Sequence, residues 1–250
     1  MQPNQVQFSI VSHAAWAPNL TTHQAWREWA KAPFVIKGDD EPSVVSMPSM
    51  LRRRAGFLGK MALEVAFQCL DGRENIPTLF CSRHGDVARA TELVSSMVQN
   101  EPLSPTNFGL AVHNAHAGLF SIARRDQANH LALSAGSNTI EHALIEACGL
   151  LADGAPSVLI VAYDNCLPDF YREYLDCQEQ PHAWAWLIES DYGNNRIRLT
   201  WSLVESAETN VVKRTDDMPC SLAVWKFYVS DDLTYENKAQ HLHWRWSKHA

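Results

Sequence analysis

One stretch of the chain has the residue order of a device that positions a reactive group. Residues 130–135 are typical of a strand and residues 138–152 of a helix, and the sharp turn Ala135-Gly136-Ser137 joins them. Such a turn lies at the free N–H groups and the positive dipole end of the helix that follows. A thiolate or an oxyanion would be stabilised there.

The hydroxyl of Ser137 could act as the nucleophile of an acyltransferase or hydrolase that works alone. It would need a base, which could come from His84, His113, His116 or His142. However, the turn lacks the G-x-S-x-G pattern of a nucleophile elbow, and no Ser/His/Asp order is readable. The alternative interpretation makes Ser137 the N-cap of the helix, a position that favours serine.

Two pairs of histidines have spacings that metal ligands could use. His113 and His116 are three residues apart, as on a helix, and His241 and His243 are two apart, as on a strand. No cysteine or carboxylate completes either pair at ligand spacing. We therefore expect no metal site and no cofactor.

Composition and charge exclude several classes of protein. The chain has 250 residues, of which 46% are hydrophobic, enough for the core of one domain. The net charge of -7 offers no basic surface to nucleic acid. No apolar run approaches the ~20 residues of a membrane span, and no signal peptide is recognisable. We expect a cytoplasmic protein without a membrane span, whose cysteines are reduced thiols.

Predicted strands and helices alternate over the first two thirds of the chain. We expect strands at 8–11, 77–81, 130–135, 158–162, 183–188, 196–203 and 221–229. We expect helices at 51–70, 86–99, 107–120 and 138–152, a short helix with Trp26 and Trp29 capped by Thr22, and a loop at 33–50. This order predicts an α/β fold, with the last third extending the sheet or wrapping its edge. We expect a single domain over 1–250, with a core at 1–164 and a strand-rich extension at 165–250.

An ordered series of short motifs resembles the N-terminal half of the β-ketoacyl synthases, which have the thiolase fold. The resemblance spans about sixty residues. Its motifs are Ser104-Pro105, Asn114, Ala117-Gly118, Ser121-Ile122, Ala135-Gly136-Ser137, His142, Asp153-Gly154-Ala155 and the strand at 158–162. The segments IVSHAAWAP, SRHGD and PLSPTNF are similar to short synthase-like proteins called chain-length factors, including those of aryl polyene clusters.

Two departures from the synthase pattern bear on catalysis. The position of the nucleophilic cysteine falls on Gly136 or Ser137, and neither is a thiol. The second half of a synthase, with its two catalytic histidines, has no counterpart, and the late histidines His182, His241, His243 and His249 match nothing recognisable. The resemblance therefore implies a non-catalytic chain-length-factor subunit. Its partners would be a full-length ketosynthase, which supplies the cysteine and histidines, and an acyl carrier protein.

The resemblance also implies which residues would line the acyl tunnel and the interface with the synthase. The helix at 86–99 would contribute one set of residues, and the segments 107–120 and 130–135 a second: Ala88, Thr91, Glu92, Phe108, Val112 and Leu133. Val112 and Leu133 could equally be ordinary core residues. The strand at 130–135 would be an element of the dimer interface. The polar turn after the strand at 77–81, Arg83-His84-Gly85-Asp86, could line a site or form a structural network.

The run Arg52-Arg53-Arg54 is basic in an acidic protein. It could dock an acidic acyl carrier protein by charge complementarity. Alternatively, it is a solvated helix start or pairs with Glu64 or Asp71. The tryptophans near the end, Trp225, Trp244 and Trp246, could stack on bases or sugars, but packing in a core or interface fits them better.

Overall fold

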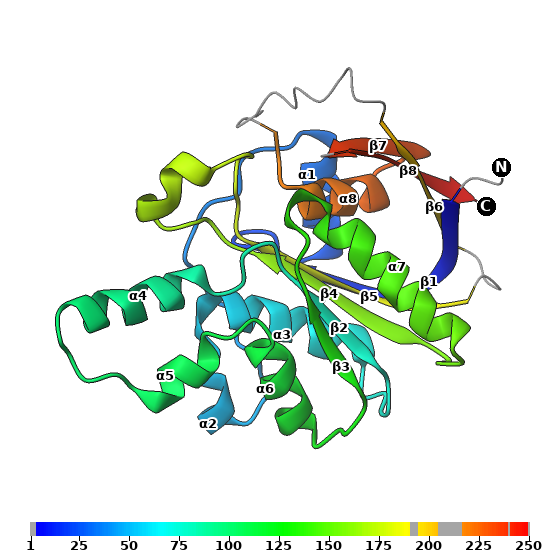
Figure 1. The fold of residues 1–250 in the computed structure, drawn as a ribbon. Helices are drawn as coiled ribbons and strands as arrows, with labels where there is room; N and C mark the ends of the chain where they lie inside the picture. The colour runs from blue at the N-terminus through cyan, green and yellow to red at the C-terminus, as the bar shows by residue number, and fades with distance from the viewer. Residues whose placement is uncertain (1–3, 191–194, 205–216, 240, 250) are drawn as a thin grey trace.

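A computed structural model of the chain describes residues 4–190, 195–204, 217–239 and 241–249 (Figure 1). Its strands form one eight-stranded sheet with the order β3-β2-β4-β5-β1-β6-β8-β7. They are β1 (Asn4–Trp16), β2 (Thr78–Cys81), β3 (His130–Leu133), β4 (Val158–Asp164), β5 (His182–Glu189), β6 (Arg196–Leu203), β7 (Thr234–Ala239) and β8 (Leu242–His249). The last third therefore extends the same sheet, because β5 pairs with both β4 and β1.

The sheet is parallel at one side and antiparallel over the rest. β2 pairs in parallel with β3 and β4, whereas the other neighbours are antiparallel. Helices provide the crossovers that parallel strands require. Every residue of β4 is buried, as expected for a strand covered on both faces. The carboxyl ends of β2, β3 and β4 therefore meet at the same edge of the sheet.

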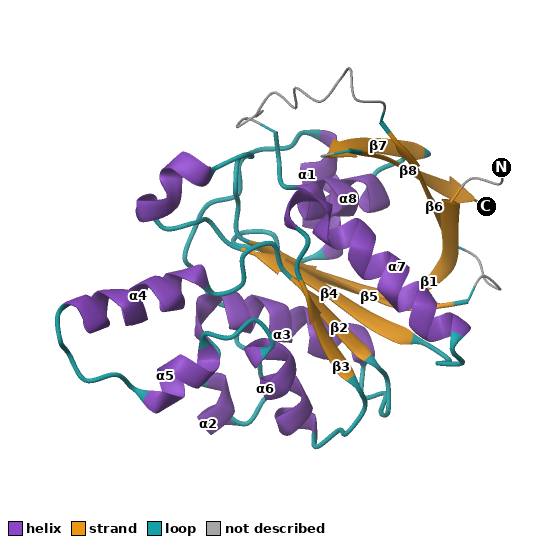
Figure 2. Cartoon of the chain, viewed as in Figure 1, coloured by secondary structure: helices purple, strands orange, loops and turns teal. Residues whose placement is uncertain are grey.

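Helices cover both faces of this sheet (Figure 2). They are α1 (His23–Lys31), α2 (Ser49–Arg52), α3 (Gly56–Leu70), α4 (Val87–Val98), α5 (Pro105–Leu110), α6 (Ala115–Arg124), α7 (Thr139–Ala152) and α8 (Cys220–Val229), with short 3-10 turns η1 (Gly136–Asn138) and η2 (Asp169–Tyr174). α3 and α6 pack on one face. α1, α7 and α8 pack on the other. Two apolar cores, one on each side of the sheet, hold these layers together.

The aromatic residues of the C-terminal third belong to one of these cores. Trp225, Trp244 and Trp246 are each at most 1% exposed, so their prediction as packing residues is confirmed. Trp225 lies 5.9 Å from Trp26 of α1, edge to face, and thereby joins α8 to α1. Thr22 caps α1 as expected, since its hydroxyl accepts a hydrogen bond from the N–H of Ala25 at 3.2 Å.

Four of the expected elements were wrong in type or extent, among them the helix expected at 51–70, which residues 53–55 divide into α2 and α3. Residues 220–229 form α8 instead of a strand, because Pro219 starts a helix that is buried on nearly every side and so lacks a polar face. The helix expected at 107–120 is two helices, α5 and α6, with an irregular segment at 111–114. The strand expected at 8–11 extends over 4–16 as β1, and neither β7 nor β8 was predicted.

Candidate functional site

The turn between β3 and α7 has the predicted strand–turn–helix geometry, but Thr139, and not Ser137, makes the side-chain hydrogen bonds that hold it. The hydroxyl of Thr139 accepts from the N–H of Ala135 at 2.9 Å and donates to the carbonyl of Gly136 at 2.7 Å. Gly136 has a φ of 58°, which glycine adopts without strain. The N-cap of α7 is Asn138, so the prediction of Ser137 as the cap was wrong. Asn138 instead accepts a hydrogen bond from the indole of Trp244 at 3.0 Å.

Among the described residues, no candidate histidine makes a hydrogen bond to the hydroxyl of Ser137, and each of them has other neighbours. His113 Nε2 lies 3.2 Å from the carbonyl oxygen of Leu133. His84 pairs with Glu179 at 3.2 Å, and His142 packs edge to face on Trp244 at 5.5 Å. The remaining candidate, His116, is buried against the ring of Tyr163.

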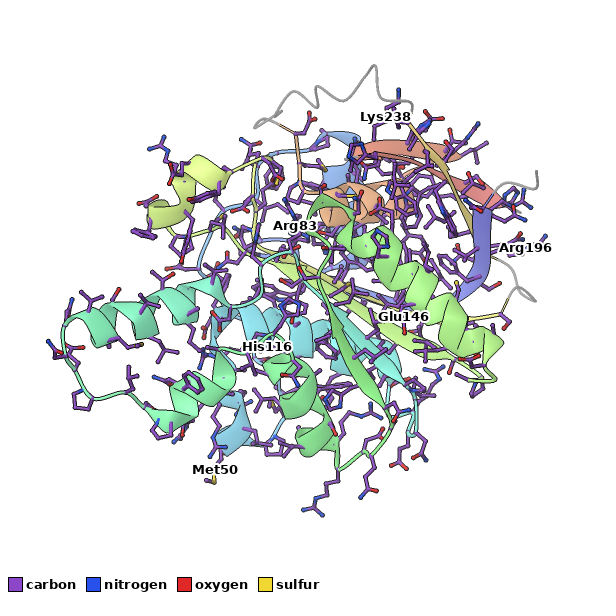
Figure 3. All side chains as sticks on the ribbon, viewed as in Figure 1. Met50, Arg83, His116, Glu146, Arg196 and Lys238 are labelled. Carbon is purple, nitrogen blue, oxygen red and sulfur yellow. The ribbon has the colours of Figure 1, made fainter. Side chains whose placement is uncertain are left out.

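Burial makes His116 an uncharged residue of the interior (Figure 3). Desolvation, with smaller contributions from the charge of Arg89 and the neighbouring His113, lowers its pKa to about 4, against the opposing charge of Asp86. The ring also fills the space above Gly59, where a Cβ atom would lie 2.5 Å from it. His116 therefore packs α6 onto α3 and is not available to activate Ser137.

A serine–histidine pair does exist elsewhere, and no motif in the sequence indicated it. His182 Nδ1 lies 2.8 Å from the carbonyl oxygen of Gln180, and its Nε2 lies 2.8 Å from the hydroxyl of Ser221. Since a carbonyl only accepts, Nδ1 carries the proton and Nε2 accepts the hydroxyl hydrogen of Ser221. The carboxylate of Asp164 lies 3.4 Å from the same hydroxyl and accepts a hydrogen bond from the hydroxyl of Ser82 at 2.9 Å.

The serine hydroxyl donates to the histidine in this pair, as in an activated serine, but the pair is buried inside the protein. Ser221 is 6% exposed and His182 is fully buried. Burial lowers the pKa of His182, against the opposing charge of Asp164, so the ring is neutral at pH 7. The network ties the start of α8 to the ends of β2, β4 and β5. We therefore interpret it as a structural connection between the last third of the chain and the parallel strands.

The predicted polar turn after β2 joins this network (Figure 3). The backbone N–H of Arg83 donates to Asp164 at 2.8 Å, and its carbonyl accepts from Ser134 at 2.7 Å. The guanidinium donates to both carboxylate oxygens of Asp176, at 2.7 and 2.8 Å, and to the sulfur of Cys177 at 2.8 Å. Burial opposes the charge, but Cys177, Asp176 and Asp164 outweigh it and raise the pKa of Arg83. Of the two alternatives predicted for this turn, the structural network is therefore confirmed.

A cleft of about 490 Å³ opens between the start of α3, α4 and α5. Residues from two predicted sets line it together: Arg53 and Arg54 from the basic run, and Ala88 and Glu92 from the predicted tunnel wall. Its volume lies in the range of small-molecule sites, roughly 300–1,000 Å³. We call this feature the α3–α5 cleft.

The walls of the α3–α5 cleft combine charge, amides and apolar surface. Arg89 donates to Asp86 at 3.0 Å and to the carbonyl of Arg54 at 3.3 Å, which ties α4 to the segment before α3. Asn107 and Asn165 also line the cleft. Phe57 contributes apolar surface. Asn165 directly follows the buried strand β4, a position where α/β proteins commonly place ligand-binding residues, so the sequence held a signal for it.

The structure separates the remaining predicted residues. Arg52 does not pair with Glu64; its guanidinium donates to the carbonyl of Ser43 at 2.9 Å, while Glu64 accepts from the N–H of Val44 at 2.7 Å. Thr91 donates to the carbonyl of Val87 at 2.7 Å, inside α4. These two residues therefore have local backbone partners.

The three apolar residues of the predicted set differ in exposure. Phe108 and Val112 are 65% and 47% exposed, so Val112 is not part of the core. Leu133 is half-buried and packs against the core that α7 covers.

Half of the exposed large apolar residues of the described chain lie on or between the elements from α4 to β3. Among the described strands, β3 is an edge, since it pairs only with β2. α4 contacts α5, α5 contacts α6, and α6 contacts β3, so the elements form a continuous side (Figure 2). The exposed apolar residues on and between them are Val94, Met97, Val98, Leu103, Phe108, Val112, Ile122 and Leu131. We call this the α4–β3 surface. Monomeric proteins seldom leave such a surface uncovered.

The described residues contain no helix long and apolar enough to cross a membrane. They also contain no group of three or more histidine, cysteine, aspartate or glutamate side chains arranged to hold a metal ion. Each of the six cysteines is a free thiol.

Comparisons with known proteins agree on the fold. Residues 26–247 match the family described as "Beta-ketoacyl synthase, N-terminal domain". The chain is similar to a chain in the structure titled "Ketosynthase (ApeO) in Complex with its Chain Length Factor (ApeC) from Xenorhabdus doucetiae", with a TM-score of 0.82, 24% identity, and coverage of 97% of this chain and 99% of that one. No significant match was found among curated proteins.

Two further structures are similar at lower identity. The structure titled "The ishigamide ketosynthase/chain length factor" gives a TM-score of 0.63 at 14% identity, covering 82% of this chain and 69% of that one. A type II polyketide acyl carrier protein in complex with its ketosynthase, AntDE:AntF, gives 0.59 at 12% identity, covering 75% of this chain and 64% of that one. The predicted thiolase-like α/β fold is thereby confirmed.

Proposed function

The chain belongs to the family of β-ketoacyl synthase N-terminal domains, and from this premise we propose that it is a chain-length-factor subunit without catalytic activity of its own. It would pair with a full-length ketosynthase in the cytoplasm and form part of the wall of the acyl tunnel. The growing product would be a polyene or polyketide-like chain, of the aryl polyene type, carried on an acyl carrier protein. Residues 1–250 would act as one domain in this role.

The chemistry of the β3–α7 turn supports the non-catalytic role. The turn carries no thiol, and among the described residues no histidine makes a hydrogen bond to the hydroxyl of Ser137 that would activate it. The scaffold that positions a nucleophile is nevertheless intact, with Thr139 closing the turn. A subunit that keeps the fold of a condensing enzyme but lacks its reactive group is suited to shaping a site that a partner completes.

The observation that carries the proposal is the α4–β3 surface. It combines an unpaired strand edge with apolar side chains from three helices, and an obligate partner would cover both. The length of the matched chain in the ketosynthase–chain length factor complex adds support, because the alignment covers nearly all of both chains. The tunnel wall would then include Ala88, Thr91 and Glu92 of α4, with Phe108, Val112 and Leu133 beside the partner.

Co-expression with a full-length ketosynthase from the same genome tests the proposal directly. We expect the chain alone to aggregate or self-associate, and the pair to purify as a 1:1 complex by size-exclusion chromatography with intact mass analysis. Failure to copurify under gentle conditions would refute the subunit role. Substituting Ser137→Ala in the reconstituted complex should leave product formation unchanged. Loss of activity in that variant would favour the alternative, an acyltransferase or hydrolase that uses Ser137.

A further inference from the structure

We propose that a cluster of aromatic side chains around α1 and α8 conducts an electron vacancy from buried tryptophans to Tyr228, which loses its proton to His13 and so ends the oxidation at the surface. The cluster consists of Trp26, Trp29, Trp184, Trp186, Trp225, Tyr228 and His13, and we call it the α1–α8 aromatic cluster. The agents that it intercepts are one-electron oxidants, such as organic peroxyl radicals. This protective activity is separate from the proposed function and does not depend on it.

The indole rings of the cluster form a continuous series of contacts. The ring centre of Trp26 lies 5.4 Å from that of Trp29 and 5.9 Å from that of Trp225. Trp184 stacks on Trp225 at 6.0 Å and lies 4.5 Å from Trp186. These separations are those of aromatic rings in direct contact, across which an electron transfers readily. Since each of these tryptophans is at most 2% exposed, the series runs through the interior of the protein.

Tyr228 on α8 brings the series to the surface. Its ring lies 5.1 Å from that of Trp186 and 5.5 Å from that of Trp225, so two members of the series contact it directly. Tyr228 is half-buried, and its neighbour His13 on β1 is exposed. A reductant in solution can therefore reach the end of the series, although it cannot reach the tryptophans.

Hydrogen bonds at Tyr228 determine where its proton goes. Asn195 Nδ2 donates to the phenol oxygen at 3.1 Å and to the carbonyl of Ile10 at 3.3 Å. The phenol hydroxyl lies 2.9 Å from Nδ1 of His13, and since its oxygen already accepts from Asn195, its hydrogen is directed to that nitrogen. Burial, with a smaller contribution from the neighbouring His23, lowers the pKa of His13, so the ring is neutral at pH 7 and can accept the proton.

The tryptophans, by contrast, have no base beside their indole nitrogens. The N–H groups of Trp26, Trp186 and Trp225 are buried and have no hydrogen-bond partner among the described residues. An indole radical cation formed at these positions keeps its proton, because a proton leaves a buried site only when an acceptor is there to take it. The vacancy therefore stays mobile until it reaches Tyr228, where proton transfer to His13 fixes it.

The electrons and protons of this sequence balance. A peroxyl radical takes one electron from a tryptophan and one proton from water, and leaves as a hydroperoxide. The indole radical cation takes an electron from Tyr228, while the phenol O–H bond breaks and the proton moves to Nδ1 of His13. A thiolate in solution then returns one electron to the tyrosyl radical and becomes a thiyl radical, and His13 returns the proton. The cluster is thereby restored, and one thiolate is oxidised for each peroxyl radical that is reduced.

Flash photoionisation with near-ultraviolet light tests the series, because it removes an electron from buried indoles without any oxidant entering the core. Transient absorption follows the tryptophan and tyrosyl radicals, and electron paramagnetic resonance of frozen samples identifies the tyrosyl radical. The sample is the complex with the ketosynthase, or the chain alone if no complex forms. We expect the tyrosyl signal to rise as the tryptophan signal decays, at a rate independent of protein concentration.

Conservative substitutions assign the signal to its residues. Tyr228→Phe keeps the ring and should remove most of the tyrosyl signal that rises as the tryptophan radical decays. His13→Phe keeps a ring but no base and should slow that rise. Tyr174→Phe is the matched control and should change neither, because Tyr174 is 64% exposed and lies on η2, outside the cluster. If the urea midpoint shows that Tyr228→Phe disturbs the fold, His13→Phe, at an exposed residue, decides the test.

Peroxyl radicals test the protective role itself. A thermal azo initiator supplies them in the presence of a thiol, and mass spectrometry of peptides measures oxidation of the tryptophans in the cluster. We expect this oxidation to accumulate faster in Tyr228→Phe than in the wild type, and at the wild-type rate in Tyr174→Phe. Equal accumulation in all three proteins would show that the cluster protects nothing.

The remaining outcomes also decide the inference. A tyrosyl signal that survives in Tyr228→Phe would show that another residue ends the series, and an unchanged rise in His13→Phe would remove His13 as the proton acceptor. A rate that increases with protein concentration would mean that the transfer occurs between molecules. Each of these results overturns the inference, whereas failure to form a complex with the ketosynthase would overturn only the proposed function.

Discussion

Truncating one exposed aromatic residue should measure how much the α4–β3 surface contributes to association. Phe108 on α5 is 65% exposed, so a partner can still bury most of its ring. Complete burial of a phenylalanine side chain contributes about 1.5–3 kcal/mol, of which 65% corresponds to roughly 1–2 kcal/mol. At about 1.4 kcal/mol per tenfold, Phe108→Ala should weaken the complex with the ketosynthase roughly 5- to 25-fold.

Folding of the chain should change little in this variant. An exposed apolar residue contributes little to the free energy of unfolding, so a change within about 0.5 kcal/mol is expected. Phe34→Ala is a matched control, because Phe34 is 54% exposed and lies outside the α4–β3 surface. It should lose no affinity for the synthase. A difference in affinity between the two variants would therefore come from the position of the ring and not from the loss of a phenyl ring in general.

A competition assay avoids the need for the isolated chain. Wild-type chain and one variant are co-expressed in equal amounts with a limiting, tagged ketosynthase, and intact mass spectrometry gives the ratio of the two chains in the captured complex. Phe108→Ala should be depleted several-fold, and Phe34→Ala should be recovered equally with the wild type. Equal recovery of Phe108→Ala would refute the assignment of this surface to the interface, and depletion of Phe34→Ala alone would move the interface elsewhere.

Three further predictions concern product length, stability and pH. Ala88→Trp places a bulky ring at the cleft and should shorten the acyl product, as seen by mass spectrometry of the released chains; Leu233→Trp should not, and unchanged length would remove Ala88 from the tunnel wall. Ser221→Ala leaves His182 Nε2 without its donor and should lower the free energy of unfolding by about 1–3 kcal/mol in urea melts; an unchanged midpoint would show that the hydrogen bond is unimportant. Because the pKa of His116 is lowered in the folded chain, the unfolded chain binds a proton first as the pH falls. The free energy of unfolding should therefore be highest above the usual pKa of 6.5 and should decrease as the pH falls toward 4. In His116→Gln this dependence of stability on pH should be weaker, which urea melts at several pH values would detect.

The parallel part of the fold could be predicted from sequence because its signals are local. β4 is a continuous apolar run, and α7 begins directly after a turn with Gly136, so the type and order of both elements were correct. The prediction failed where a local irregularity interrupts the alternation of residues along a strand. A bulge between Ile10 and Ser12 shifts the alternation of β1, and the strand was therefore predicted far too short.

The serine–histidine pair could not have been predicted from spacing. His182 and Ser221 are 39 residues apart, and Asp164 lies 57 residues before Ser221. The strand predicted over 221–229 also placed Ser221 in the wrong element. Valine, tryptophan and phenylalanine are enriched in strands, and their presence led to that prediction. In α8 these residues are buried on several sides, and such a helix shows no amphipathic period.

The arrangement of the α3–α5 cleft explains why two separate predictions can describe one site. The basic run and the tunnel residues are more than thirty positions apart in the sequence, and each was predicted for its own reason. Arg89 brings them together, since its guanidinium contacts both Asp86 at the start of α4 and the carbonyl of Arg54. A carrier that docks on the arginines would therefore lie beside α4. Selection for product length and selection for carrier binding would then act on the same cleft, and a substitution at Ala88 should affect both.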